Sequence, residues 1–392
     1  MIGFLLLFLL ICMPAVAKSA LPQMGISAGA EEEGRAAVER GVDTLLAELD
    51  FSSLEDLNVP FGGEGMSIRE AVKALALGGT VSPEEMVSGV LSAFVKAVSG
   101  MGNMMLSLML PVLLSSLLLS TAASRSGGLS GALRSVFSVL ILVPVILIVI
   151  SELRHTQKTI TSMTEKMDKL LPLLLTLLTA LGGHASSAFL HPLVVAASGS
   201  MVFLAREVIL RLVMCTCAVT AVNHLSDRMH LTRMAQLLRS AVCWLLGVSF
   251  TVFLGAMSLQ GVCSASIDGV TLRAAKYAVD NFVPIVGGMF SDTMDTLVGC
   301  ALIVKNALGV CTVLVLLAAL MGPLVRTLAV VFVMKLSAAL LEPVADEVMI
   351  RAIGDFSRTV VLFLITMLCV GTMFFLLIVQ MLLVGNLTVL LR

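Results

Sequence analysis

The sequence predicts an all-α protein, a polytopic membrane helix bundle with interrupted or re-entrant helices. The chain is 58% hydrophobic and 13% charged, whereas soluble domains are about 45–50% apolar and about 25% charged. From Asn103 onward, apolar runs near the roughly 20 residues that cross a bilayer alternate with short charged loops. The net charge of −1 argues against a nucleic-acid partner, which would favour a basic surface.

The first 17 residues, MIGFLLLFLLICMPAVA, predict a signal peptide over 1–17. An apolar core is followed by Pro14 and by the small-residue pattern Ala15-Val16-Ala17, which suits cleavage before Lys18. The alternative is an uncleaved N-terminal anchor, because only the α-amine supplies positive charge ahead of the apolar core. Cleavage would place the residues that follow outside the cytoplasm.

Residues 18–100 predict a small, acidic, extracytoplasmic helical region. They hold 13 Asp and Glu against six Lys and Arg, a balance that is open to a translocated domain. Two helix starts are expected, one at the capping box Ser67-Ile68-Arg69-Glu70 and one at Ser82-Pro83-Glu84-Glu85. Because so short a region has little apolar patterning, we expect it to lean on the membrane portion.

Residues 101–392 predict the transmembrane domain. No acid accompanies Arg125 and Arg134 in their loop, so this loop is expected in the cytoplasm. Gly182-Gly183 and Pro192 interrupt the run 170–223, which allows either three short crossings or one re-entrant hairpin plus one crossing. The expected spans are Met104–Ala123, Leu133–Ile150, the run 170–223, Ala241–Leu259, the interrupted run Val283–Leu341 and Val360–Val384.

The spacing of polar residues and prolines predicts a tandem internal repeat with units of about 133–240 and 240–360. Aligning Pro172 with Pro284 also aligns Asp168 with Asp280, and both segments then read T-x8-D-x3-P with a Gly-Gly pair further on. Such repeats are common in membrane transport folds. Chance similarity is the alternative, because few positions match.

The segment 272–309 places polar residues and helix breakers between apolar runs. Pro284 removes a backbone donor, and Gly287-Gly288 permits a bend. Broken backbone at membrane depth must be buried in protein or line a wet cavity. We therefore expect two re-entrant segments that face each other across a pathway or docking cavity. The candidate residues of the first are Asp268, Gly269, Lys276, Asp280, Pro284, Gly287, Gly288, Asp292, Lys305 and Asn306; those of the second are Asp168, Pro172, Gly182, Gly183 and Pro192.

Lys305 lies near the middle of an apolar run and has two interpretations. A lysine at bilayer depth normally faces the protein interior or a cavity and seeks an acid, for which Asp292 and Asp295 are candidates. Alternatively, Lys305 extends to an interface or is neutralised by a structural carboxylate.

Other chemistry is not indicated. The chain has no phosphate-binding glycine loop, no G-x-G-x-x-G and no H-E-x-x-H. His184 and His191 are seven residues apart, but Gly183 and Pro192 would break the helix needed to hold both. Cys215 and Cys217 would point to different sides of a helix. We therefore expect no enzymatic activity, no cofactor and no metal site.

The run WLLGVSFTVFLGAMSLQGVCSASIDGVTLRAAKYAVDNFVPIVGGMFSDTMDTLVGCALIVKNALG, residues 244–309, resembles the stage III sporulation protein AE family of endospore-forming bacteria. Gly322-Pro323 and Leu341-Glu342-Pro343 extend the resemblance, as does the order of signal, acidic outer region and polytopic bundle. The resemblance covers nearly the whole mature chain, with the outer region similar only in general character.

The resemblance implies an integral component of the mother-cell membrane around the forespore. There it would join other stage III A sporulation proteins and a forespore-membrane partner in a secretion-like transenvelope channel complex. This complex is needed for late forespore development. The family is regarded as permease-like or channel-forming, so the chain would form or gate a conduit. The alternative is a structural membrane platform that docks ring-forming partners and conducts nothing. A homo-oligomer is compatible with both.

Overall fold

The computed structural model describes residues 42–44, 58–61, 64–76, 83–123, 129–180, 184–225, 231–282, 287–345 and 347–390. Within them the chain is almost entirely helical, which confirms the predicted class. The predicted signal peptide lies outside the described residues. The elements are β1 (Asn58–Phe61), β2 (Glu64–Ser67), α3 (Ile68–Ala76), α4 (Pro83–Gly100), α5 (Gly102–Ala123), α6 (Leu129–Ala180), α7 (His184–Phe203), the π-helix η2 (Leu204–Ile209), α8 (Leu210–Leu225), α9 (Thr232–Phe282), α10 (Gly287–Leu341) and α11 (Glu347–Leu390).

The N-terminal region combines a β-hairpin with two helices. β1 and β2 pair antiparallel, with Asn58 opposite Ser67 and Phe61 opposite Glu64, so the expectation of helices alone was incomplete. The predicted capping box is confirmed at the start of α3. The Glu70 amide donates to Ser67 Oγ, and the Ser67 amide donates to Glu70 Oε2, each over 3.4 Å. The second predicted start is confirmed by α4, which begins at Pro83.

Replacing Ser67 by alanine should loosen α3. The change removes the acceptor for the Glu70 amide, and the loss of an N-cap side chain costs about 1 kcal/mol. We expect faster hydrogen–deuterium exchange of the α3 amides. Ser107→Ala is the control, because that hydroxyl donates only within its own helix, to the Met104 carbonyl. Unchanged exchange in α3 would contradict the role of the cap.

The helices of the membrane portion are longer than the apolar runs that predicted them. α6 has 52 residues, about 78 Å at 1.5 Å per residue, and it continues through Pro144 and Pro172. The expected interruption at Pro172 is therefore not seen. Packing neighbours let a helix tolerate proline, because they compensate for the lost hydrogen bond. After α6, a single helical path of α7, η2 and α8 returns, and it contains Pro192 within α7.

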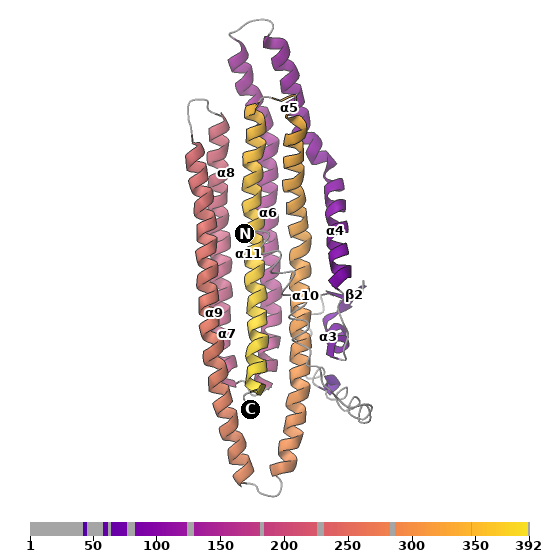
Figure 1. Ribbon diagram of the computed structural model, residues 1–392, viewed down its shortest axis with the longest axis vertical. Helices are drawn as coiled ribbons and strands as arrows, with labels where there is room; N and C mark the ends of the chain where they lie inside the picture. The colour runs from indigo at the N-terminus through magenta and orange to yellow at the C-terminus, as the bar shows by residue number, and fades with distance from the viewer. Residues whose placement is uncertain are drawn as a thin grey trace.

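The long helices form one elongated bundle (Figure 1). α11 lies at its centre and packs against α6, α8, α9 and α10. The ends of α5, α8 and α10 and the starts of α6, α9 and α11 lie at one end of the bundle, here called the loop end, while α11 finishes at the other. α3 and α4 lie against α10. The N-terminal region thus leans on the bundle.

Four helical segments among the described residues are long and apolar enough to cross a membrane. They are Val139–Thr179, Thr232–Ser258, Gly299–Leu341 and Glu347–Leu383. A fifth arises if Val90–Gly100 and Gly102–Leu118, which meet at a bend of 41°, count as one span. The chain therefore has the composition and helix lengths of a membrane protein.

Two glycines let α10 and α11 approach closely. Gly309 of α10 lies against the Leu382 side chain, where an added methyl group would overlap Cδ2. Gly371 of α11 lies against the Leu320 side chain in the same way, and a methyl group at Gly371 would lie 2.6 Å from Leu320 Cδ2. Small residues at such positions allow close helix packing in membranes, where van der Waals contact contributes strongly to helix association.

Candidate functional site

The first predicted re-entrant segment divides between two long helices. Asp268, Gly269, Lys276 and Asp280 lie in α9, which continues to Phe282. Gly287, Gly288 and Asp292 begin α10. Pro284 lies outside the described residues, as do the side chains of Asp268, Lys276, Asp280 and Asp292. The described parts of α9 and α10 form two long arms that extend beyond the end of α11 (Figure 1). A re-entrant dip at Pro284 therefore stays a prediction.

The second predicted segment is also dispersed along helices. Asp168 and Pro172 lie inside α6, and Pro192 lies inside α7. Gly182 and Gly183 fall outside the described residues. In the proposed repeat, Pro172 matches Pro284, yet Pro172 sits within a helix. The duplication therefore stays a prediction too.

Lys305 and Asn306 are the predicted site residues that the structure buries most deeply. Lys305 is 1% exposed and Asn306 is 3% exposed, both in α10. The Lys305 ammonium donates to the backbone carbonyl of Leu382 in α11 over 2.8 Å. The side chains of Asp292 and Asp295, the predicted partners, are outside the described residues. Lys305 therefore joins α10 to α11, and its side chain is shielded from solvent.

A second buried polar contact joins α6 to α10. Glu152 is 2% exposed, and its Oε2 accepts a hydrogen bond from Thr327 Oγ1 over 2.8 Å. One turn further along α6, the His155 ring lies beside the Pro323 backbone of α10. Sequence reasoning missed Glu152 because it stands where an apolar run meets a charged one. Such a position is typical of an interfacial residue.

An ionic cluster at the loop end centres on Asp355 of α11. Its carboxylate lies 3.2 Å from His224 Nε2, 3.4 Å from Arg239 Nη1 and 3.3 Å from Arg358 Nη1. Arg239 also donates to the Asp355 carbonyl over 3.0 Å and to Thr220 over 3.4 Å. The cluster therefore joins α8, α9 and α11.

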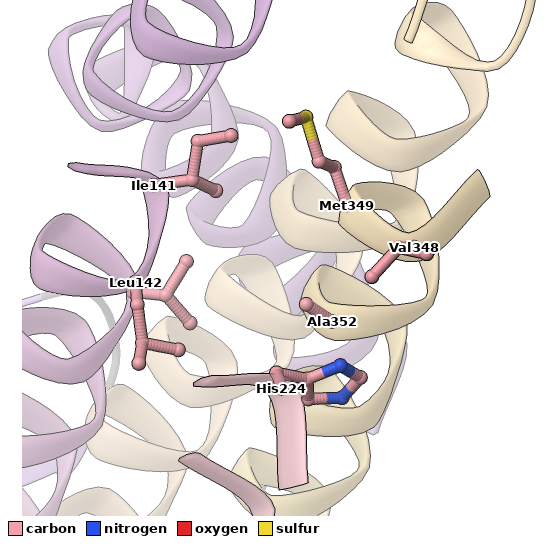
Figure 2. Close-up of a pocket in the computed structure, with 7 residues that line it drawn as sticks. Ile141, Leu142, His224, Val348, Met349 and Ala352 are labelled. Carbon is pink, nitrogen blue, oxygen red and sulfur yellow. The ribbon is translucent and has the colours of Figure 1, made fainter. Parts of the chain in front are cut away.

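Figure 2 shows a small pocket beside this cluster. Ile141, Leu142 and Val145 of α6, His224 of α8, and Val348, Met349 and Ala352 of α11 line it. Its cavity volume is about 20 Å³, room for about one water molecule. A second cavity, between α7, α9 and α11, holds about 10 Å³. Neither is large enough for a solute path through the bundle.

No cluster of three or more potential metal ligands occurs among the described residues.

The profile of the stage III sporulation protein AE family matches residues 66–385. The chain belongs to the stage III sporulation protein AE family. Membership in this family implies a role in sporulation, and the matched region contains every predicted site residue.

The stage III sporulation protein AE of Bacillus subtilis (strain 168) is 32% identical to this chain over 240 residues. The aligned region covers 61% of this chain and 60% of the relative, less than two thirds of its length. No solved structure matches the chain. The fold of this member of the AE family is therefore known from its own helix bundle.

Proposed function

We propose that this chain is an integral membrane component on the mother-cell side of a transenvelope sporulation complex, where it forms or gates a conduit needed for late forespore development. The match to the AE family over residues 66–385 carries this proposal. The apolar helices support a multi-pass location in the membrane. The proposed partners are other stage III A proteins and a forespore-membrane protein.

We place the loop end in the mother-cell cytoplasm. Helices α5, α8 and α10 end there, and the sequence that follows α5 and α8 includes Arg125, Arg134, Arg228 and Arg233. Cytoplasmic loops are enriched in Lys and Arg, whereas acids contribute little to orientation. This orientation would put residues 18–100, after removal of a signal peptide over 1–17, on the extracytoplasmic side.

A platform that conducts nothing is the second candidate, and the packed interior favours it. Lys305, which a path through the bundle would need to expose, is buried and bonded to Leu382. The described cavities hold about 20 and 10 Å³. Neither cavity provides a path through the described part of the bundle, so a conduit there would have to run between this chain and other chains.

Deletion of the chain in its spore-forming host should abolish heat-resistant spores and late forespore gene expression. If Lys305 serves packing and not passage, complementation with Lys305→Met should restore both close to the wild-type level, because methionine fills nearly the same volume between α10 and α11. The measurement is spore titre after heating, with chain abundance in the membrane determined in parallel.

Two outcomes would contradict these expectations. Normal sporulation in the deletion strain would remove the proposed role. Loss of spores with Lys305→Met at normal chain abundance would instead show that the Lys305 charge itself is needed, as a path through the bundle requires. Lys305→Glu is a useful comparison, because it places an acid next to a carbonyl and should lower chain abundance.

A further inference from the structure

The contact between α6 and α10 encloses a carboxyl group with a single hydrogen-bond partner among the described residues. Glu152 of α6 is 2% exposed, and its Oε2 accepts a hydrogen bond from Thr327 Oγ1 of α10. An ionised carboxylate offers about four acceptor sites. Within the described part of the chain no lysine, arginine or histidine forms an ion pair with it. Glu152 is therefore a buried acid that no described cation neutralises by contact.

Thr156, one turn further along α6, has a hydroxyl group that does not bond to its own helix. Thr156 is 0% exposed, and its Oγ1 has no hydrogen-bond partner among the described residues. Residues four apart lie on the same side of a helix, so Thr156 stands beside Glu152. The other threonines of α6 each donate to a backbone carbonyl of α6, and they are Thr159, Thr161, Thr164, Thr176 and Thr179.

His155 brings another unpartnered atom to this contact. Its Nε2 is buried and has no hydrogen-bond partner in the described part of the chain, and its ring lies beside the Pro323 backbone of α10. Pro323 stands one turn before Thr327 in α10, so the ring lies next to the Glu152 contact. Pro323 also has no N–H for the Ala319 carbonyl, which leaves a further acceptor in α10. Acceptors thus gather around a buried acid, and such a group takes up a proton or a cation.

Cations lie near the site, but none of the described ones contacts the acid. Arg326 of α10 is close enough to Glu152 to act on it electrostatically, and Arg326 and Lys158 both act on the His155 ring. Arg326, Lys158 and the neighbouring Arg154 are exposed. None of the three forms an ion pair with a described residue. Water screens such exposed charges, so they compensate a buried carboxylate poorly.

The other helices around this contact present apolar residues or paired charges. α5 contains no ionisable side chain. α6 and α11 run in the same direction (Figure 1), and Met163 lies against Gly371, so the same register sets Glu152 level with Val360. Val360 is 0% exposed. The ionisable groups that neighbouring helices carry nearest this level are Asp355 and Arg358 of α11, which pair with each other, Arg211 of α8 and Glu207 of η2, which also pair, and Lys96 of α4, which is exposed.

An ionised Glu152 would be poorly stabilised in this place. Burial of an unpaired carboxylate is costly, and such a group takes up a proton instead. Arg326 and Lys158 repel a positive imidazole at His155, so the proton belongs on the carboxyl group. We propose that Glu152 binds one proton from water in the folded chain at neutral pH and so holds α6 against α10. Thr156 Oγ1 and His155 Nε2 are the acceptors for the new O–H, directly or through one water molecule.

Release of this proton should loosen the contact between α6 and α10. An ionised Glu152 needs hydration, and water reaches it only when the two helices separate. Movement of α10 against α6 would therefore be coupled to the exchange of one proton. Such a proton-dependent latch would operate in a conduit and in a platform alike, so it goes beyond the proposed function and does not depend on it.

Infrared spectroscopy tests whether Glu152 carries the proton. The purified chain in detergent at about pH 7 should show the band of a protonated carboxylic acid, although exposed Asp and Glu are ionised at that pH. We expect Glu152→Gln to remove intensity from this band. Glu165→Gln should leave the band unchanged, because Glu165 is exposed on the same helix. An unchanged band in Glu152→Gln would show that Glu152 is ionised and would overturn the proposal.

Thermal unfolding at several pH values tests the latch. A folded chain that holds one more proton than the unfolded chain loses stability as the pH rises, by up to about tenfold in the unfolding constant per pH unit between about pH 5 and about pH 8. The midpoint should therefore fall more steeply with pH in the wild type than in Glu152→Gln, which stays neutral. Glu165→Gln should follow the wild type. Parallel curves for the wild type and Glu152→Gln would contradict the latch.

A second variant tests the acceptor. Thr156→Val keeps the shape of the side chain and removes the hydroxyl, so it should shift the carboxylic acid band of Glu152. Thr161→Val is the control, because the Thr161 hydroxyl donates to the Gln157 carbonyl of its own helix. An unshifted band in Thr156→Val would remove Thr156 from the site.

Sodium is the competing ligand. Replacing choline chloride by sodium chloride at constant ionic strength should change the midpoints of the wild type and Glu152→Gln equally. A rise in sodium that only the wild type shows would assign the site to a metal ion and overturn the proton. None of these measurements depends on sporulation, so their failure would leave the proposed role in spore development standing.

Discussion

Replacing Gly309 by alanine is expected to destabilise the bundle, whereas Gly322→Ala in the same helix is not. The added methyl group at Gly309 overlaps the Leu382 side chain, which is 5% exposed and has little room to move. Overpacking of this kind costs about 1–3 kcal/mol. At Gly322 a methyl group meets nothing within 4 Å, and alanine is the better helix former by about 0.5–1 kcal/mol. The measurement is the thermal unfolding midpoint of the purified chain in detergent.

The double variant Gly309→Ala with Leu382→Ala separates close packing from other effects of the glycine. Removing the Leu382 side chain makes room for the new methyl group, so the two changes should be less destabilising together than the sum of their single effects. Strict additivity would show that Leu382 is not what the methyl group meets. A Gly309→Ala chain as stable as Gly322→Ala would contradict the close approach of α10 to α11.

The sequence located the helices well and their ends poorly. The predicted spans Met104–Ala123 and Val360–Val384 lie within α5 and α11. The expected spans stop at Ile150 and resume at residue 170, but in the structure the charged stretch between them continues α6. Its charges recur at helical spacing and fall on one side of the helix, so the periodicity was present in the sequence. Hydropathy averaged over a window removes that signal, because it does not record which side of a helix is polar.

The sequence indicates which residues belong to the candidate site, but not which atoms those residues contact. The sequence leaves Lys305 with two interpretations, an interior position or one at an interface, and in the structure it is buried. Its acceptor is a backbone carbonyl 77 residues further along the chain, at Leu382. Every residue has such a carbonyl, so composition cannot single one out. Arg239 and Arg358, each followed by a hydroxyl residue and a long apolar run in the sequence, both contact Asp355 in the structure.

Replacing Asp355 by alanine is expected to be the most damaging single change at the loop end. Asp355 is the only carboxylate that pairs with Arg239 and His224 among the described residues, and the Arg239 and His224 side chains are 15% and 11% exposed. Removing one partner leaves a poorly hydrated charge uncompensated. For a buried pair that costs about 3–5 kcal/mol, and the partial exposure here reduces it to roughly 2–3 kcal/mol. The measurement is again the thermal midpoint, with chain abundance in the host membrane.

Glu347→Ala is the matched control for Asp355→Ala, because it removes an acid from the same helix. Glu347 pairs with Arg351, but both side chains are largely exposed, at 74% and 66%. Water can solvate the exposed Arg351 guanidinium once the carboxylate is removed, so this change should leave the thermal midpoint unaltered. Adding Arg239→Met to Asp355→Ala should recover part of the lost stability, because it removes the charge left without a partner. Equal effects of Asp355→Ala and Glu347→Ala would show that the cluster does not hold α8, α9 and α11 together.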